Sequence, residues 1–180
     1  MAMTGIFGGR FDPPHVGHLA LARAARERFD FAELVVTVVA DAAHKPSEAS
    51  AADRLAMARL TFADLPATVE LEEHRTTVDA LEGHRYEDPI FLIGADELAA
   101  FPTWKEPDRV LELTRLGVAT RPGADPPAPT SERIEPFPIE PIDVSSTAIR
   151  ARVRNGAPLD GLVVPAVAAY IAAHDLYGAA

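Results

Sequence analysis

The chain has 180 residues, 48% of them apolar and 24% charged, and its 27 acidic residues outnumber 17 basic ones, for a net charge of −10. This length fits one domain over residues 1–180, and the acidic balance argues against a protein that coats nucleic acid. The lack of cysteine excludes disulfides, thiolate metal sites and a cysteine nucleophile. With no transmembrane-length apolar run and no recognisable secretion signal, we expect a cytoplasmic enzyme or binding protein without membrane or nucleic-acid partners.

Strand-like and helix-like segments alternate along the chain. Apolar, β-branched runs predict strands at residues 4–7, 34–39, 68–71, 90–93 and 116–119, with an extended edge segment at 134–139. Helical spacing and capping residues predict helices at residues 19–29, 50–64, 76–81, 108–113, 146–155 and 165–174. Residues 121–133 are rich in proline, which predicts a loop. The alternation predicts an α/β fold, a Rossmann-like doubly wound parallel sheet with helices on both faces in a single domain.

The turn between the first strand and the first helix is the most informative segment. It reads Gly-Gly-Arg-Phe-Asp-Pro-Pro-His-Val-Gly-His over residues 8–18. Such a turn aims backbone N–H groups and the positive end of the helix dipole at one point, and Gly8 and Gly9 let a phosphate approach the main chain. In parallel sheets, ligands bind at the carboxyl ends of the strands, at the point where the strand order reverses. Because this turn follows the carboxyl end of the first strand, a phosphate site is expected here.

His15 and His18 add two imidazoles to the same turn. A lone histidine is usually a surface residue or a hydrogen-bonded core residue. Two of them flanking Gly17 next to a predicted helix N-terminus favour another interpretation. That end of a helix disfavours imidazolium unless a phosphate supplies the opposing charge. The pair therefore indicates phosphate contact and transition-state stabilisation.

A second candidate segment opens the helix predicted from residue 146. Ser145, Ser146 and Thr147 are typical N-cap residues, and that alone explains them in most proteins. Arg150 follows Thr147 by three residues and therefore projects from the same side of the first turn. Hydroxyls, a guanidinium and a helix N-terminus together indicate a second phosphate cradle.

These two segments resemble the signatures G-G-T-F-D-P-x-H-x-G-H and I-S-S-T-x-I-R of a nucleotidyltransferase superfamily. The resemblance implies that both segments converge on the triphosphate of ATP, with His15, His18 and Arg150 catalytic. The implied ATP-binding residues are Gly8, Gly9, Arg10, Phe11, His15, His18, Asp96, Ser145, Ser146, Thr147 and Arg150. Arg10 stands where the signature has threonine, and Val144 replaces isoleucine.

The middle of the chain resembles the bacterial nicotinate mononucleotide adenylyltransferases. The similar segments are residues 44–46 (His-Lys-Pro), 77–81 (Thr-Val-Asp-Ala-Leu), 94–96 (Gly-Ala-Asp), 101–104 (Phe-Pro-Thr-Trp) and the closing stretch from residue 162. By this resemblance, Trp104 stacks on the nicotinate ring, Thr77 and the Lys105 backbone N–H receive its carboxylate, and Lys45 lies near substrate phosphate. The same resemblance places Asp96 in the ribose or adenosine part of the site.

Each of these middle residues also has a structural interpretation. Trp104 can belong to the core, Lys45 can be a solvated loop residue, and Asp96 can cap a helix. Arg75 and Thr76 replace the serine and tyrosine that usually precede Thr77, which leaves one side of the pocket undefined.

The resulting functional hypothesis is an adenylyltransferase that joins nicotinate mononucleotide to the AMP part of ATP, giving deamido-NAD and pyrophosphate. The expected cofactor is Mg²⁺ bound with ATP, with no protein metal ligands identified. The alternatives are transfer to nicotinamide mononucleotide or phosphopantetheine, a nucleotide-binding regulator without catalysis, and a purely structural α/β domain. The sequence is compatible with a homo-oligomer and does not determine the oligomeric state.

Overall fold

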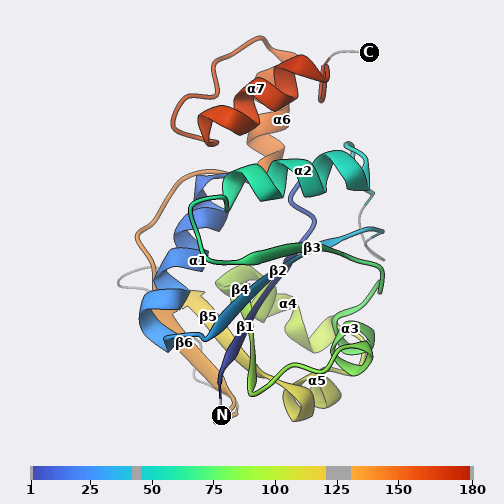
Figure 1. The fold of residues 1–180 in the computed structure, drawn as a ribbon, viewed down its shortest axis with the longest axis vertical. Helices are drawn as coiled ribbons and strands as arrows, with labels where there is room; N and C mark the ends of the chain where they lie inside the picture. Colours follow the sequence, from blue (N-terminus) through green and yellow to red (C-terminus); the bar gives the residue numbers. More distant parts are fainter. Residues whose placement is uncertain (1, 42–45, 121–130, 179–180) are drawn as a thin grey trace.

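A computed structural model describes residues 2–41, 46–120 and 131–178 of the chain. Its centre is a parallel sheet of six strands (Figure 1). The strands are β1 (Thr4–Gly9), β2 (Glu33–Val39), β3 (Thr68–Glu72), β4 (Pro89–Gly94), β5 (Arg115–Thr120) and β6 (Ile134–Pro138). The helices are α1 (Val16–Phe29), α2 (Ala51–Thr61), α3 (Thr77–Gly83), α4 (Ala95–Ala100), the 3₁₀ turn η1 (Phe101–Thr103), α5 (Pro107–Leu113), α6 (Ser146–Arg154) and α7 (Pro165–Ala173).

The strand order is β3-β2-β1-β4-β5-β6, so the direction of winding reverses between β1 and β4. Ile6 of β1 pairs with Val35 of β2 on one side and with Phe91 of β4 on the other. Helices on both faces cover the sheet, which confirms the predicted doubly wound α/β fold. The turn after β1 lies at the reversal point, where such sheets bind their ligands.

Each face of the sheet has its own apolar core. Leu19, Ala22 and Phe29 of α1 pack with Val36 and Phe62 on one face. Val78 and Leu81 of α3 and Val110 of α5 pack with strand residues on the other face. Both faces bury alternate residues of the same strands, which explains why the strand sequences are apolar almost throughout.

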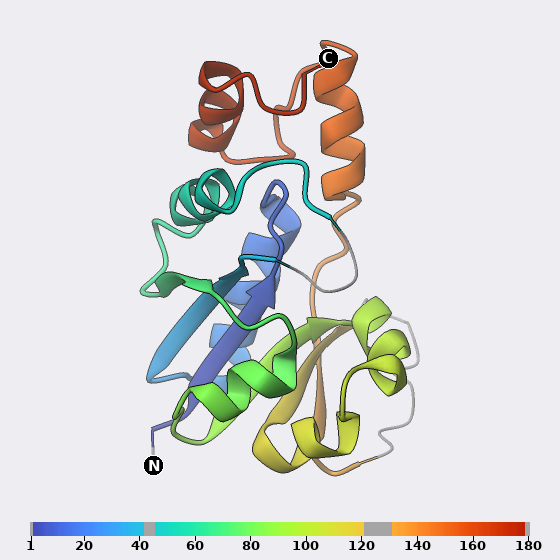
Figure 2. The ribbon, with the colours of Figure 1, turned by 90° about the vertical axis from the view of Figure 1, so that its right-hand side faces the viewer.

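Helices α6 and α7 lie past the ends of the strands, on the same side as α2 (Figure 2). A third apolar cluster joins them: Met57 of α2 packs with Ile149 of α6, Val167 of α7 and Tyr177. The C-terminal part of the chain is therefore held against the carboxyl-end side of the sheet.

The main differences from the sequence-based expectation concern α1 and α4, while α2 ends at Thr61 rather than residue 64 and η1 was not predicted. Helix α1 begins at Val16 rather than residue 19, because His15 and His18 form a capping box that extends the helix into the motif. The short helix α4 was not predicted, since six residues following a strand carry too little periodicity. The predicted loop at 121–133 lies largely outside the described residues. None of the described helices is long and apolar enough to span a membrane.

Candidate functional site

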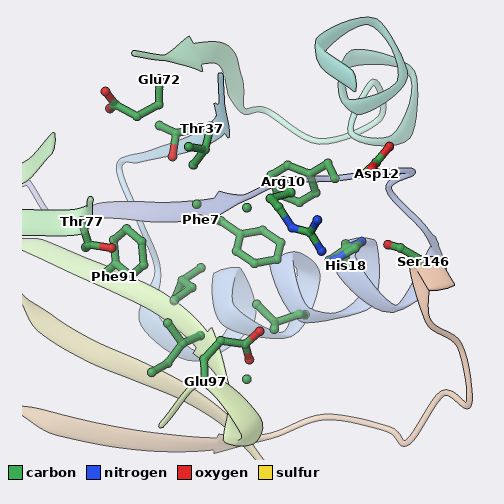
Figure 3. Close-up of a pocket in the computed structure, with 18 of the residues that line it drawn as sticks. Phe7, Arg10, Asp12, His18, Thr37, Glu72, Thr77, Phe91, Glu97 and Ser146 are labelled. Carbon is green, nitrogen blue, oxygen red and sulfur yellow. The ribbon is translucent and has the colours of Figure 1, made fainter. Parts of the chain in front are cut away.

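A cavity of about 600 Å³ opens at the carboxyl end of β1 (Figure 3). The predicted site residues that line it are Gly8, Gly9, Arg10, Phe11, His15, His18, Thr77, Asp96, Trp104, Ser145 and Ser146. Arg10, His18 and Ser146 lie at one end of the view and Glu72 and Thr77 at the other. One cavity thus unites residues from the beginning, middle and end of the chain.

The two imidazoles of the opening motif are stacked on each other. Their ring centroids are 3.6 Å apart with an interplanar angle of 22°. His15 is the N-cap of α1, and its backbone N–H donates to His18 Nδ1 at 3.1 Å. The edge of Phe11 contacts His18 at a centroid distance of 5.0 Å. The helix start therefore fixes both rings at the cavity before any ligand binds.

Burial keeps both imidazoles neutral. It lowers the pKa of His15 from 6.5 to about 4. The pKa of His18 is also well below its ordinary value, through burial first and the neighbouring His15 second. His15 Nδ1 is buried and has no hydrogen-bond partner among the described residues. Buried polar atoms without a hydrogen-bond partner are rare in native proteins, so this nitrogen stands out at the cavity.

The depressed pKa of His15 predicts a pH dependence of stability. Between pH 4 and 6.5 the unfolded chain binds this proton and the folded chain does not, so the free energy of unfolding rises with pH in that interval. His15→Gln removes the contribution. Denaturant unfolding of both proteins between pH 4 and 8 should show the wild type losing stability more steeply as pH falls below 6.5. Parallel curves would contradict the depressed pKa.

Gly17 provides the space in which the His15 ring lies. A Cβ at this position would be 3.0 Å from His15 Nδ1 and 3.0 Å from Val144 Cγ1. Because alanine favours a helix over glycine by about 0.5–1 kcal/mol, the intrinsic effect of Gly17→Ala is stabilising. The new methyl group must nevertheless push the imidazole aside.

We therefore expect Gly17→Ala to leave the thermal midpoint within a few degrees of wild type. If His15 contacts substrate as the sequence predicts, kcat/KM for the expected adenylyl transfer should fall by about tenfold, less than the roughly 10²-fold that a full 1 Å misplacement can cost. Thermal unfolding and steady-state kinetics check both parts. A large fall in the thermal midpoint together with the fall in kcat/KM would instead indicate general disruption of the fold.

The start of α6 meets the opening motif directly. The Ser146 hydroxyl donates to the Pro13 carbonyl at 2.8 Å, and Ser145 accepts the Ala148 N–H at 3.1 Å as the N-cap. Both serines line the cavity, so Ser145 is an N-cap and a cavity residue at once. Thr147 is exposed and lies outside the cavity lining. The two motif segments are thus in direct contact.

Arg150 reaches the opening motif but does not line the cavity. Its guanidinium donates to the Asp12 carbonyl at 2.8 Å and, through Nε, to Glu48 Oε1 at 2.8 Å. Arg154 pairs with the other oxygen of Glu48. Arg150 therefore joins the motif turn to residue 48, and its predicted phosphate contact stays a prediction.

Sequence reasoning missed Arg54, a supporting residue beneath the site. Its side chain is fully buried and donates to four backbone carbonyls, those of Arg10, Val39, Ala40 and Ala49, at 2.7–3.2 Å. These bonds hold the ends of β1 and β2 and the start of α2 together. Its spacing in the sequence could have indicated that Arg54 is buried, because residues 54, 57, 58 and 61 follow helical periodicity and form the buried stripe of α2.

The other end of the cavity holds the predicted substrate residues. Thr77, the first residue of α3, lines it, as do Asp96 and Trp104. Trp104 packs edge-on against Phe91 and Phe101, so it serves both the core and the cavity wall. Asp96 is exposed in the first turn of α4 without acting as its cap.

Of the other two predicted substrate residues, only Lys105 can be placed, and it does not line the cavity. Lys105 is exposed next to Trp104, and its ammonium pairs with Asp79 Oδ1 at 2.6 Å. This ion pair connects the segment after η1 with the start of α3. Lys45 lies outside the described residues.

A doubly wound parallel sheet with a cavity at its reversal point, lined there by glycines, imidazoles and hydroxyls, is typical of nucleotide-binding α/β proteins. The sequence matches the cytidylyltransferase-like family over residues 6–152, and the chain belongs to this family. This confirms the resemblance drawn from the two motif segments.

Relatives that align with almost the whole chain share one name within this family. A protein of Chromobacterium violaceum named probable nicotinate-nucleotide adenylyltransferase is 37% identical, covering 98% of this chain and 99% of its own length. A Laribacter hongkongensis protein of the same name is 38% identical, covering 96% and 93%. The solved Plasmodium falciparum nicotinic acid mononucleotide adenylyltransferase complexed with NaAD has a TM-score of 0.82 at 17% identity and covers 98% of each chain, which shows the shared fold.

Proposed function

We propose that this protein is a nicotinate-nucleotide adenylyltransferase that joins nicotinate mononucleotide to the AMP part of ATP. One observation supports this most directly: the cavity at the reversal point unites the H-x-G-H turn, the start of α6 and Thr77 with Trp104. The full-length similarity to proteins named for this activity agrees with it.

The reaction needs no nucleophile from the protein. A 5′-phosphate oxygen of nicotinate mononucleotide attacks the α-phosphorus of ATP in line. The new P–O bond forms as the bond from the α-phosphorus to the bridging oxygen breaks, and pyrophosphate leaves with that electron pair. The attacking oxygen is already anionic, so no proton has to be removed. The protein has to bring two polyanions together and stabilise the charge that moves to the leaving group.

One end of the cavity is lined by Arg10, His15, His18, Ser145 and Ser146 and is here named the phosphate end. Its donor groups suit this task. We propose that the N–H groups of His15 and His18, the hydroxyls of Ser145 and Ser146 and the Arg10 guanidinium bind the triphosphate. Neutral imidazoles can approach the Arg10 cation without repulsion, and a bound polyanion would raise their pKa towards the charged form. Arg150 would complete the phosphate contacts by exchanging its bond with Glu48 for one with ATP.

ATP would enter as its magnesium complex. Mg²⁺ prefers oxygen ligands and is usually held through substrate phosphates and water. The described groups at the phosphate end are mostly imidazoles, hydroxyls and a guanidinium, which suit phosphate oxygens rather than a hard cation. The metal would neutralise triphosphate charge, and the residues named above would orient the nucleotide.

The opposite end would receive the mononucleotide. Trp104 offers a flat face to an electron-poor pyridine ring, and the Thr77 hydroxyl can donate to its carboxylate. The paired Lys105 and Asp79 hold the two segments that carry these groups, so they would set the width of the ring pocket.

The test is pyrophosphate release from purified protein supplied with ATP, Mg²⁺ and one of three acceptors: nicotinate mononucleotide, nicotinamide mononucleotide or phosphopantetheine. We expect the acid mononucleotide to have the highest kcat/KM, by at least about tenfold, because its carboxylate meets a polar pocket. Absence of pyrophosphate under varied pH and metal would refute the activity. ATP binding without turnover would instead favour a nucleotide-binding regulator.

A further inference from the structure

A cluster of three titratable side chains lies near Thr77, at the end of the cavity proposed to bind the mononucleotide. It consists of Glu72, His74 and His84, and the proposed reaction does not use it. Glu72 is the last residue of β3, His74 follows two residues later, and His84 is the C-cap of α3. His74 Nδ1 is 2.6 Å from Glu72 Oε1, and His84 Nε2 is 3.0 Å from Glu72 Oε2. One carboxylate thus connects the two ends of the β3–α3 segment.

The carboxylate is buried and its partners are accessible. The Glu72 side chain is 5% exposed, against 42% for His74 and 37% for His84. Among the described residues, no lysine or arginine forms an ion pair with Glu72. Glu72 Oε1 also accepts the His74 backbone N–H at 2.8 Å. A hydrogen bond satisfies the oxygen but does not neutralise the charge of a buried carboxylate, so this arrangement suits a cation that arrives from solvent.

The side-chain atoms of these three residues that could coordinate a metal ion lie close together. One atom from each of the three residues lies within 4.8 Å of the others, close enough to share one ion. Gly83 is part of this geometry: a Cβ there would come within 2.6 Å of His74 Cε1. The end of α3 therefore leaves room for the His74 ring to lie over it, which a larger residue would not allow.

We propose that Glu72, His74 and His84 form a binding site for Zn²⁺. Two imidazole nitrogens and one carboxylate oxygen are a common zinc donor set in which a fourth position stays open. The same set is poor for Mg²⁺, which prefers oxygen. The cluster would therefore select a transition metal in the presence of the magnesium that accompanies ATP.

The ion would fix the segment that carries Arg75, Thr76 and Thr77 into the cavity. Glu72 and His74 also line that cavity, so the open coordination position would face it. We assign the ion a positioning role, with no part in the transfer of the adenylyl group. This assignment goes beyond the proposed function and can be tested without ATP.

Metal-free, tag-free protein is titrated with Zn²⁺ by calorimetry and with Co²⁺ by visible absorption. We expect one equivalent to bind and the intense absorption of a low-coordinate Co²⁺ site to appear. His84→Ala should lower the affinity by more than about 100-fold, since outer partners of metal ligands alone are worth 10–100-fold. Gly83→Ala should weaken binding although every ligand remains. Absence of stoichiometric binding to wild type would overturn the proposal.

Two histidine variants outside the cluster serve as controls. His174→Ala removes a ring that stacks on Tyr170 far along the chain, and His15→Ala disrupts the stacked histidine pair. Both should bind the metal as wild type does. If binding is lost in His15→Ala and kept in His84→Ala, the site lies elsewhere and the proposal is wrong.

Thermal unfolding guards against misfolded variants. Zn²⁺ should raise the melting temperature of wild type and leave that of His84→Ala unchanged, provided both have the same circular dichroism without metal. Because none of these readouts involves adenylyl transfer, a negative result leaves the proposed activity standing, and an inactive protein can still bind the ion.

Discussion

His18→Ala is expected to lower kcat of the adenylyl transfer by about 10²–10³-fold, the usual loss when one preorganised donor to a developing charge is removed. His18 lines the phosphate end of the cavity and is fixed by its stacking on His15 and its contact with Phe11. It also accepts the His15 backbone N–H at the start of α1. The alanine variant therefore loses the proposed phosphate contact and the hydrogen bond to the His15 N–H together.

His18→Gln separates these two roles. A glutamine at the third helical position can reach back to the N-cap N–H as histidine does, so the capping box is kept. We expect its melting temperature to lie near that of wild type while kcat stays as low as in His18→Ala. Rapid-quench measurement of deamido-NAD formation, together with thermal unfolding, checks this. A glutamine variant with near wild-type kcat would assign His18 a purely structural role.

The location of this site follows from local sequence. A glycine-rich turn between a strand and a helix is recognisable from neighbouring residues alone, and a parallel sheet brings the carboxyl ends of its strands to one edge. His15 and His18 could therefore be placed at the carboxyl ends of the strands before the strand order was known, whereas Thr77 was assigned to the site by resemblance. The start of α1 was placed too late because an imidazole capping box resembles neither serine nor glutamate in the sequence.

The support of the site depends on contacts that no local pattern contains. Arg54 lies on the buried stripe of α2, where arginine is unexpected. Its four carbonyl partners are supplied only where the ends of β1 and β2 meet the start of α2. Arg150 was predicted to face phosphate, yet its Nε bonds Glu48, a residue placed by the path of the chain before α2. Such pairs join residues far apart in sequence, so they require the tertiary structure.

Asp12 is the centre of this supporting network, and Asp12→Asn should destabilise the protein by about 3 kcal/mol. Its buried carboxylate accepts the Glu48 N–H at 2.7 Å, the Ala49 N–H at 3.1 Å and the Tyr177 hydroxyl at 2.8 Å. An amide has one accepting oxygen, so one backbone N–H loses its acceptor in either orientation of the side chain.

The substitution also removes the negative charge that contributes most to stabilising the buried Arg54 guanidinium. Burial lowers the pKa of that guanidinium, and the charge of Asp12 acts in the opposite direction. Without it, a buried cation remains with only neutral carbonyl partners, and leaving a buried charge uncompensated is costly. The Asp12 carboxylate also anchors the motif turn whose carbonyl, that of Asp12 itself, orients Arg150. We therefore expect the KM for ATP to rise in Asp12→Asn, because the turn that carries the proposed phosphate contacts is displaced.

Tyr177→Phe is the matched control, because it removes one donor from Asp12 and leaves the carboxylate and both backbone bonds in place. It should cost about 1 kcal/mol, the worth of one ordinary hydrogen bond, and leave the KM for ATP unchanged. Urea unfolding of both variants gives the comparison. If Asp12→Asn costs no more than Tyr177→Phe, the carboxylate serves only to hold the C-terminal tyrosine. A larger loss means that one side chain joins the motif turn, the start of α2 and the end of the chain into a single support for the phosphate end of the cavity.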